Sequence, residues 1–330
     1  MMRKRSVGWC LVIALSLLGC VLPASAGAPL SVKYATTVAP DHPNNLAALR
    51  FAETVNRESR GQVKVEVFPA AQLGNEKELI ENTMLGSISM FQVSPGALSL
   101  FQSDLGIFDC PYIFRDFDHM MKSVTGEIGK ELSAKLEKSR GVRVLSHGFY
   151  YGARHLTTKN KAIKEPADLK GMLIRGPDQP IYLEAIRAMG ATPTPVAFSD
   201  LYMALRQGVV DGQENPIPTI YSYKYYEAQK FLMLTGHMIR TISVGTNAKW
   251  FDGLPGDVKQ LFLRALADSE KFNNDLVHQQ EKELLEKLKG LGMTVVQPNV
   301  EAFRTAAKGI PKKFEDKWGK GLYERIVAVK

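Results

Sequence analysis

The residue patterns that build the commonest catalytic sites are missing from this sequence of 330 residues. Its six histidines form no HExxH motif and no closely spaced pair, whereas a zinc site needs three or four donors. There is no GxSxG nucleophile elbow and no GxxxxGKS/T phosphate loop, and Gly319-Lys320-Gly321 lacks the rest of a dinucleotide fingerprint. Distant residues can still form an acid–base pair, so these absences only lower the expectation of catalysis. The pattern favours a binding protein that uses no cofactor and no metal.

Composition and charge indicate a soluble protein with small partners. Hydrophobic residues make up 45% and charged residues 23%, as in ordinary globular proteins. At about 150 residues per domain, the length predicts two domains. The net charge of +8 falls to +5 without residues 1–26, an excess that can attract small anions, but no block of Lys and Arg and no basic–aromatic interleaving indicates nucleic acid. Cys110 is the one cysteine outside the N-terminal apolar run, so it has no disulfide partner and we expect it to be buried.

The N-terminus is typical of an export signal. A positive segment, Arg3 to Arg5, precedes an apolar run from Val7 to Leu22, and Ala24-Ser25-Ala26 is a small-x-small cleavage site. The run is short for a membrane span, so we expect residues 1–26 to be removed and the mature chain, with a net charge of +5, to be exported. The alternative is a lipoprotein, because Leu17-Leu18-Gly19-Cys20 resembles a lipobox that would leave Cys20 lipidated.

Strands and helices alternate in the first part of the mature chain. Alternating valines between 63 and 67 predict a half-buried strand, and apolar residues at helical spacing follow Asn44 and Asn45, which can cap a helix. The order strand, helix, strand, helix, strand implies parallel pairing with helices on both faces. The predicted elements are a strand at 30–38, a helix from 44 or 45 to about 55, a strand at 63–67, a helix at 75–85 and a strand at 88–93.

A second α/β unit follows, and the chain passes twice between the two units, near 145–155 and 239–247. The space between such units is a usual ligand site, so we expect an interdomain cleft. Residues 27–150 with part of roughly 240–330 form domain I, residues 151–239 form domain II, and a long helix at 256–289 spans both. The predicted elements here are strands at 142–149, 154–157, 172–175 and 239–247, helices at 182–189 and 200–207, the latter capped by Ser199, and the long helix from Pro255 that Gly290 closes.

One stretch carries more specific information. Residues 169–216 read LKGMLIRGPDQPIYLEAIRAMGATPTPVAFSDLYMALRQGVVDGQENP. This stretch resembles the signature region of the solute-binding proteins of tripartite ATP-independent periplasmic (TRAP) transporters, the DctP-type family. YATTVAPDHP near the start, FPAAQLGNEKELIE at 68–81, LGIFDCPYIF at 105–114 and YYGARHLTTKN at 150–160 resemble family segments in the same order. The resemblance therefore covers nearly the whole mature chain.

The resemblance implies a two-domain α/β periplasmic-binding-protein fold and a protein that captures a small organic acid and catalyses nothing. Its partners would be the carboxylate ligand and the small and large membrane subunits of a TRAP transporter, with the protein itself a periplasmic monomer. Transport in this family is driven by an ion gradient at the membrane subunits, which agrees with the missing nucleotide motif. The identity of the acid stays open between a C4-dicarboxylate, a 2-oxo or 2-hydroxy acid, a sugar acid and an aromatic acid.

The resemblance also implies specific ligand contacts. Arg175 in LIRGPDQP matches the arginine that clamps the ligand carboxylate, and its planar guanidinium offers two parallel donors. Arg154 in GARHLTT matches a second arginine that supports the ligand or the hinge, unless it forms a structural ion pair. Asn215 in QENP matches an asparagine that bonds the carboxylate, unless it only forms a turn before Pro216. Phe198 in AFSD matches an aromatic that packs on the ligand, unless it belongs to the core.

The sialic-acid-binding members of the family imply further ligand contacts, with less support from this sequence. Glu76 matches an acid in those members, whereas Thr37, Val93 and Asp178 stand where they carry an asparagine, a glutamate and an asparagine. These departures argue against sialic acid. Four further residues are candidates for lining the ligand cleft: Tyr150, Tyr151, Gln213 and His237.

Two other functions remain to be compared with solute capture. A periplasmic enzyme acting on carboxylates would need a general acid or base near Arg175, for which Glu76 or Asp178 could serve. A ligand-sensing partner of a membrane receptor would share the same fold and site, and only the membrane protein to which it docks would distinguish it.

Overall fold

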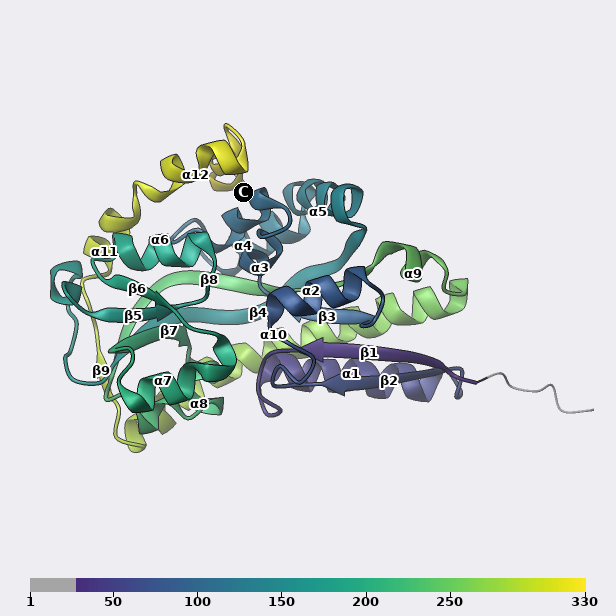
Figure 1. The fold of residues 1–330 in the computed structure, drawn as a ribbon, viewed down its shortest axis with the longest axis horizontal. Coiled ribbons are helices and arrows are strands. Elements are labelled where there is room, and N and C mark those ends of the chain that lie inside the picture. Colours follow the sequence, from purple (N-terminus) through teal and green to yellow (C-terminus); the bar gives the residue numbers. More distant parts are fainter. Residues whose placement is uncertain (1–27) are drawn as a thin grey trace, which may run out of the picture.

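The computed structural model describes residues 28–330 as a mixed β-sheet with helices on both faces (Figure 1). The predicted export signal at residues 1–26 and the alternative lipidation at Cys20 lie outside the described residues. The strands are β1 Leu30–Thr36, β2 Val63–Phe68, β3 Met90–Val93, β4 Val142–Thr158, β5 Leu173–Gly176, β6 Thr192–Pro195, β7 Gly212–Pro216, β8 Phe231–Asn247 and β9 Thr294–Val296. The α-helices are α1 Pro43–Glu58, α2 Glu76–Met84, α3 Pro95–Leu98, α4 Phe117–Thr125, α5 Glu127–Arg140, α6 Pro180–Ala188, α7 Leu201–Gln207, α8 Ile217–Ser222, α9 Ala248–Asp252, α10 Gly256–Gly290, α11 Val300–Ala307, α12 Ile310–Trp318 and α13 Leu322–Val327. Short 3-10 turns are η1 Ser103–Asp109, η2 Pro166–Leu169, η3 Phe198–Asp200 and η4 Tyr225–Glu227.

The sheet consists of two parallel halves joined by two long antiparallel strands. Its order is β2-β1-β3-β8-β4-β7-β5-β6, with β9 paired to β8. On one side β1 pairs in parallel with β2 and β3, as the alternation of elements predicted. On the other side β5 pairs in parallel with β6 and β7. Strands β4 and β8 run from one half to the other (Figure 1), so the two halves form the two lobes of a two-domain α/β fold.

The two strand crossings are longer than predicted. The strands expected at 142–149 and 154–157 form one strand of 17 residues, β4. Strand β8 also has 17 residues, because it begins at Phe231 and not at 239 as predicted. Four register shifts interrupt the pairing of β4 with β8 between Val144 and Leu156, and Gly152 sits at one of them with φ +111°, a conformation that favours glycine. The two predicted strands omit residues 150–153, because Gly152 reads as a break in a strand pattern.

Helix α10 supports this bulged segment from the outside. The Asn274 amide accepts the Tyr150 N–H at 2.8 Å and donates to the Gly148 carbonyl at 2.9 Å. The Glu281 carboxylate accepts the Ala153 N–H at 2.7 Å. Side chains of α10 therefore satisfy backbone groups that the bulges remove from the sheet ladder, which keeps β4 continuous.

The long helix has the predicted extent and packs on both lobes. It begins after Pro255, ends at Gly290, and contacts α1 of the first lobe and α8 of the second. Among the described residues, 28–330, no helix has the combination of length and apolarity needed to cross a membrane.

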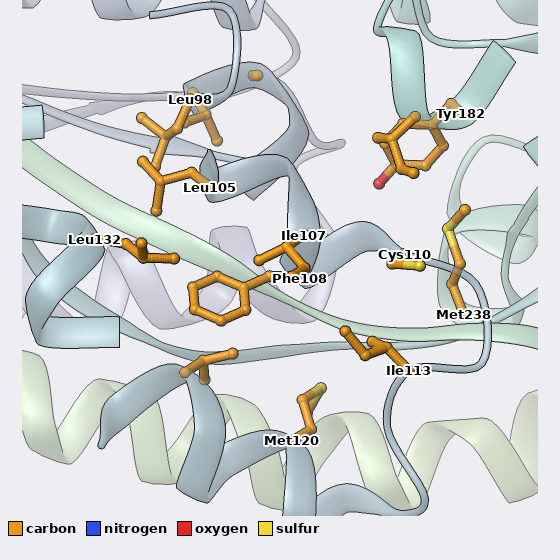
Figure 2. Packing of buried hydrophobic residues seen from close by; sticks show 14 of the residues in the cluster. Leu98, Leu105, Ile107, Phe108, Cys110, Ile113, Met120, Leu132, Tyr182 and Met238 are labelled. Atoms are coloured by element: carbon orange, nitrogen blue, oxygen red, sulfur yellow. The ribbon is translucent and has the colours of Figure 1, made fainter. Parts of the chain in front are cut away.

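A large hydrophobic cluster includes residues of both lobes. Tyr182 of α6, in the second lobe, belongs to the same buried cluster as Leu98 of α3 and Met238 of β8 (Figure 2). The C-terminal helices α11 to α13 contribute buried side chains to this cluster (Figure 1). Cys110 lies in the cluster and is 2% exposed, so the prediction that it is buried is confirmed.

Two predicted helix caps are wrong. The first helix is capped by His42, whose Nδ1 accepts the Asn44 N–H at 3.2 Å. Asn44 and Asn45 lie inside the helix, because Pro43 occupies its first position, where proline is favoured. Ser199 lies in the η3 turn, and the residue at the N-cap of α7 is Asp200.

Candidate functional site

Two connected cavities lie between the lobes and collect the seven predicted ligand contacts. The inner cavity leaves about 40 Å³ for the centres of water-sized molecules, and the outer one, toward solvent, leaves about 590 Å³. The predicted residues that line the inner cavity are Thr37, Glu76, Arg154, Arg175, Phe198 and Asn215. Those that line the outer cavity are Thr37, Glu76, Arg175, Asp178 and Phe198.

Arg175 is a buried cation without a protein anion. It lies near the end of β5, which is placed between β6 and β7, and it is 2% exposed. Its Nε donates to the Val196 carbonyl at 2.9 Å, and its guanidinium carbon lies 5.8 Å from the centre of the Phe198 ring. Within residues 28–330 no carboxylate pairs with it, and neither terminal nitrogen donates a hydrogen bond. Desolvation lowers the pKa of Arg175, as expected for a buried charge that lacks a counter-ion.

Arg154 has its own counter-ion. On β4, it forms a buried ion pair with Glu214 of the neighbouring β7: its Nε donates to Oε2, and its Nη2 donates to Oε1 at 2.8 Å and to the Glu214 carbonyl at 2.7 Å. His237 lies with Nε2 3.1 Å from Glu214 Oε2. Burial alone would raise the pKa of Glu214, but Arg154 and His237 outweigh it and lower the pKa to about 2. The geometry favours the structural ion pair, although Arg154 also lines the cavity wall.

Asn215 lies in a strand and not in a turn. It belongs to β7 and pairs with His155 of β4. Its amide Nδ2 donates to Gln213 Oε1 at 2.5 Å, and Gln213 Nε2 donates to Thr157 Oγ1 at 3.0 Å. This chain of amides fixes the orientation of the Asn215 side chain at the cavity wall, whereas Gln213 itself does not line the cavity.

Glu76 joins the two lobes across the cleft. It is the first residue of α2, after the predicted cap Asn75. Its carboxylate accepts the Ser94 N–H at 2.6 Å, the Ser94 hydroxyl at 3.0 Å and the Gln179 amide of the second lobe at 3.1 Å. Three hydrogen bonds therefore hold Glu76, which fits a positioning role better than that of a mobile proton donor.

Thr37 and Asp178 lie nearer the cleft opening. The Thr37 carbonyl accepts the hydroxyl of Tyr223, which lies in the second lobe, at 2.7 Å. Asp178 is exposed on the outer cavity, where Lys77 of α2 is also part of the lining. Phe198 is half-buried, and its ring packs edge-to-face on Tyr223 with the ring centres 4.7 Å apart. The first and second lobes thus meet directly around the opening.

Among the four further candidates, Tyr151 lines the inner cavity and the other three do not. Successive residues of a strand point to opposite faces, and the hydroxyl of Tyr150 accordingly bonds to Glu281 of α10 at 3.2 Å. Gln213 and His237 are fully occupied in the networks around Asn215 and Glu214.

Sequence reasoning missed a third arginine, Arg240 of β8. It is 6% exposed, lines the inner cavity, and lies with its guanidinium carbon 4.3 Å from the centre of the Tyr151 ring. Its Nη1 donates to the Tyr182 hydroxyl at 2.8 Å and is 3.8 Å from Asp109 Oδ2, while its buried Nε has no partner. Burial raises the pKa of Asp109 against the opposing effect of Arg240. The available signal was one arginine inside the otherwise uncharged run 239–247.

A groove elsewhere on the molecule has a different chemistry. It lies between α5 and α10, leaves about 530 Å³, and contains none of the predicted residues. Its arginine, Arg143, is bonded to Glu137 at 2.9 Å and to Asp252 at 3.1 Å, so this guanidinium already has protein counter-ions. No group of three or more His, Cys, Asp or Glu residues suitable for a metal ion occurs in the described part of the chain, residues 28–330.

Comparison with known proteins gives consistent matches over most of the chain. Residues 34–317 match the family model of the bacterial extracellular solute-binding proteins, family 7, DctP. The chain is 34% identical to a solute-binding protein of Verminephrobacter eiseniae, over 92% of this chain and 90% of the relative. It is 33% identical to the C4-dicarboxylate-binding periplasmic protein DctP of Rhodobacter capsulatus, over 100% of this chain and 98% of the relative. A TRAP periplasmic solute-binding protein of Bordetella bronchispeptica, crystallised with density assigned to pantoate, superposes with a TM-score of 0.86 at 35% identity, over 91% of this chain and 99% of that one.

Proposed function

This chain belongs to the DctP-type bacterial extracellular solute-binding proteins, family 7, and we propose on that premise that it captures a small organic-acid anion between its lobes and delivers it to the membrane subunits of a TRAP transporter. It acts in the periplasm as a monomer, after cleavage of residues 1–26, and catalyses no reaction. The relatives support the ligand class, since the Rhodobacter protein is named for C4-dicarboxylates and the Bordetella structure has density assigned to pantoate.

The observation that carries this proposal is the unpaired guanidinium of Arg175. A buried charge without a partner is costly, and proteins keep such a group where a ligand supplies the opposite charge. The two terminal nitrogens of Arg175 are free of hydrogen bonds to residues 28–330, and a guanidinium fork matches the two oxygens of a carboxylate. Asn215 and Phe198 stand on the same cavity wall and complete the carboxylate end of the site.

Removal of the Arg175 side chain tests the proposal. Two charge-assisted hydrogen bonds at about 1.5–3 kcal/mol each predict that Arg175→Ala weakens carboxylate binding by two orders of magnitude or more. Arg175→Lys keeps the charge without the fork and should bind with intermediate affinity. The matched control is Arg187→Ala on α6, because Arg187 is exposed and, within residues 28–330, pairs only with Glu184.

The measurement is calorimetry on the wild type and these variants, with acids first identified by native mass spectrometry of protein purified from cells. Melting curves should show that Arg175→Ala remains folded. Near-native affinity in Arg175→Ala would reject the clamp, and failure of the wild type to bind any carboxylate would reject the function. Recovery of a chemically altered acid after incubation would instead identify an enzyme.

A further inference from the structure

We propose that Arg240 recognises a second, uncharged oxygen of the ligand, so that the cavity selects monocarboxylates carrying a hydroxyl or keto oxygen on the carbon next to the carboxylate. This inference rests on the proposed function and narrows it to 2-hydroxy and 2-oxo acids, including longer acids of that type. Arg240 would then set specificity, while Arg175 supplies the anchor for the carboxylate.

Arg240 is built into the cavity wall by contacts that fix its plane. The guanidinium carbon lies 4.3 Å from the centre of the Tyr151 ring, and the Tyr182 hydroxyl accepts a hydrogen bond from Nη1 at 2.8 Å. Nη2 makes no hydrogen bond to any residue between 28 and 330, and the buried Nε also has none. The guanidinium is more than nine-tenths buried, and its plane is fixed by the Tyr151 ring. It can therefore direct the N–H groups that have no protein acceptor to a ligand atom.

The charge of Arg240, unlike that of Arg175, is already matched. Asp109 is fully buried with Oδ2 3.8 Å from Nη1, and this oxygen accepts the Gly96 N–H and the Tyr182 hydroxyl, each at 2.8 Å. Burial raises the pKa of Asp109, but Arg240 and the two hydrogen bonds donated to Oδ2 oppose this and favour the ionised carboxylate. The ionised Asp109 forms a neutral pair with Arg240, and a second ligand carboxylate beside them would be a buried charge without compensation. A neutral oxygen avoids this cost.

The size of the inner cavity places the second oxygen close to the carboxylate. Arg175 and Arg240 both line a space of about 40 Å³, and about 10–15 Å³ of such space is needed for one water. A carboxylate and one oxygen on the adjoining carbon fill this volume. Val38 and Ile242 form apolar parts of the same wall, and the remaining cation there, Arg154, is already paired with Glu214. The rest of a longer ligand extends into the outer cavity, past Phe198.

The test compares acids that differ by one oxygen. Calorimetry would measure butanoate, 2-hydroxybutanoate and 2-oxobutanoate, then hexanoate with 2-hydroxyhexanoate, and finally succinate. Wild-type protein should bind the oxygenated acid of each pair at least tenfold more tightly, because the unsubstituted acid leaves buried donors unpaired. Arg240→Met should lose this preference and keep the weaker affinity for the unsubstituted acid.

Two further variants keep the test decisive. Arg240→Lys retains a positive charge beside Asp109 and so preserves folding if Arg240→Met does not, and it should also lose most of the preference because it lacks the fork. Arg187→Met on the exposed face of α6 is the matched control and should keep the full preference.

Each outcome separates this inference from the function on which it rests. Equal binding of the paired acids by wild type, or an unchanged preference in both Arg240 variants, overturns the role of Arg240 and leaves carboxylate capture intact. Tightest binding of succinate, lost specifically in the Arg240 variants, overturns the uncharged oxygen in favour of a second carboxylate. Failure of every acid to bind wild type overturns both proposals.

Discussion

Glu214→Gln should destabilise the protein strongly while leaving most of its carboxylate affinity. Glutamine has nearly the same shape as glutamate, but an NH₂ group replaces one of the two carboxylate oxygens. This NH₂ group would face the N–H donors of Arg154 or His237. Arg154 is 1% exposed and Glu214 is its only ionic partner within residues 28–330. Breaking a buried ion pair by removing one partner costs about 3–5 kcal/mol, because the other charge stays buried.

The expected signature is a change in stability without a matching change in binding. For a protein of this size, 3–5 kcal/mol corresponds to a fall of roughly 6–20 °C in the melting temperature. Calorimetric affinity should change by less than tenfold, since the carboxylate clamp is Arg175 and not Arg154. Arg175→Ala should show the reverse: lost affinity, with ligand-free stability close to that of the wild type, because no carboxylate within residues 28–330 pairs with Arg175.

Thermal unfolding and calorimetry on the two variants distinguish the roles of the two arginines. Glu58→Gln provides a control, because Glu58 is an exposed carboxylate that also pairs with arginine, and it should melt like the wild type. Wild-type melting of Glu214→Gln would refute the buried-pair argument. A hundredfold loss of affinity in that variant would show that Arg154 and Glu214 belong to the ligand contacts.

Two further predictions concern stability. Burial lowers the pKa of three histidines, to about 3 for His42 and His155 and to about 4 for His147. As the pH falls, the unfolded chain therefore takes up protons before the folded protein does. The free energy of unfolding should be at its full value above about pH 6.5 and should fall toward pH 4 by up to about 1.4 kcal/mol per pH unit for each histidine. Urea unfolding at pH 7.5, 6 and 5 measures the slope, and a flat profile contradicts it. Gly212→Ala should cost about 1–3 kcal/mol, because its Cβ would lie 2.2 Å from the Thr157 carbonyl oxygen. Wild-type melting of that variant would show that the backbone yields.

Local patterns predicted the elements that bury one apolar face. Strands β1 and β2 and helix α10 have clear periodicity and were placed correctly, because burial of one face imposes that period. Strand β7 was not predicted, since its sequence GQENP has no apolar pattern although all five residues are buried. Its buried groups are satisfied by the Arg154 ion pair and the amide chain through Thr157, which are contacts to β4 that depend on the tertiary fold. Strand β6, TPTP, has two prolines and lies at the sheet edge, the usual place for proline.

The candidate site was predicted through resemblance more than through pattern. The family motifs identified seven residues that line the cavities. They did not predict the pairing of Arg154 with Glu214, and they did not indicate that Arg240 belongs to the site. The first requires that β4 and β7 be antiparallel neighbours, which no local period indicates. The second requires the register of β8 opposite a strand with four bulges, and a one-residue slip would turn Arg240 to the other face.

The same electrostatics links ligand capture to the contact between the lobes. Hydrogen bonds from Gln179 to Glu76 and from Tyr223 to Thr37 join the lobes through protein atoms alone, so they would favour contact with or without an anion. Contact also buries Arg175, and this cost opposes it as long as no carboxylate neutralises the guanidinium. An acid removes that cost and adds charge-assisted hydrogen bonds, so it binds the closed arrangement better than an open one. We therefore expect that Arg175→Ala lets the lobes meet without ligand, and small-angle scattering of that variant without acid should give the compact profile that the wild type shows only with acid.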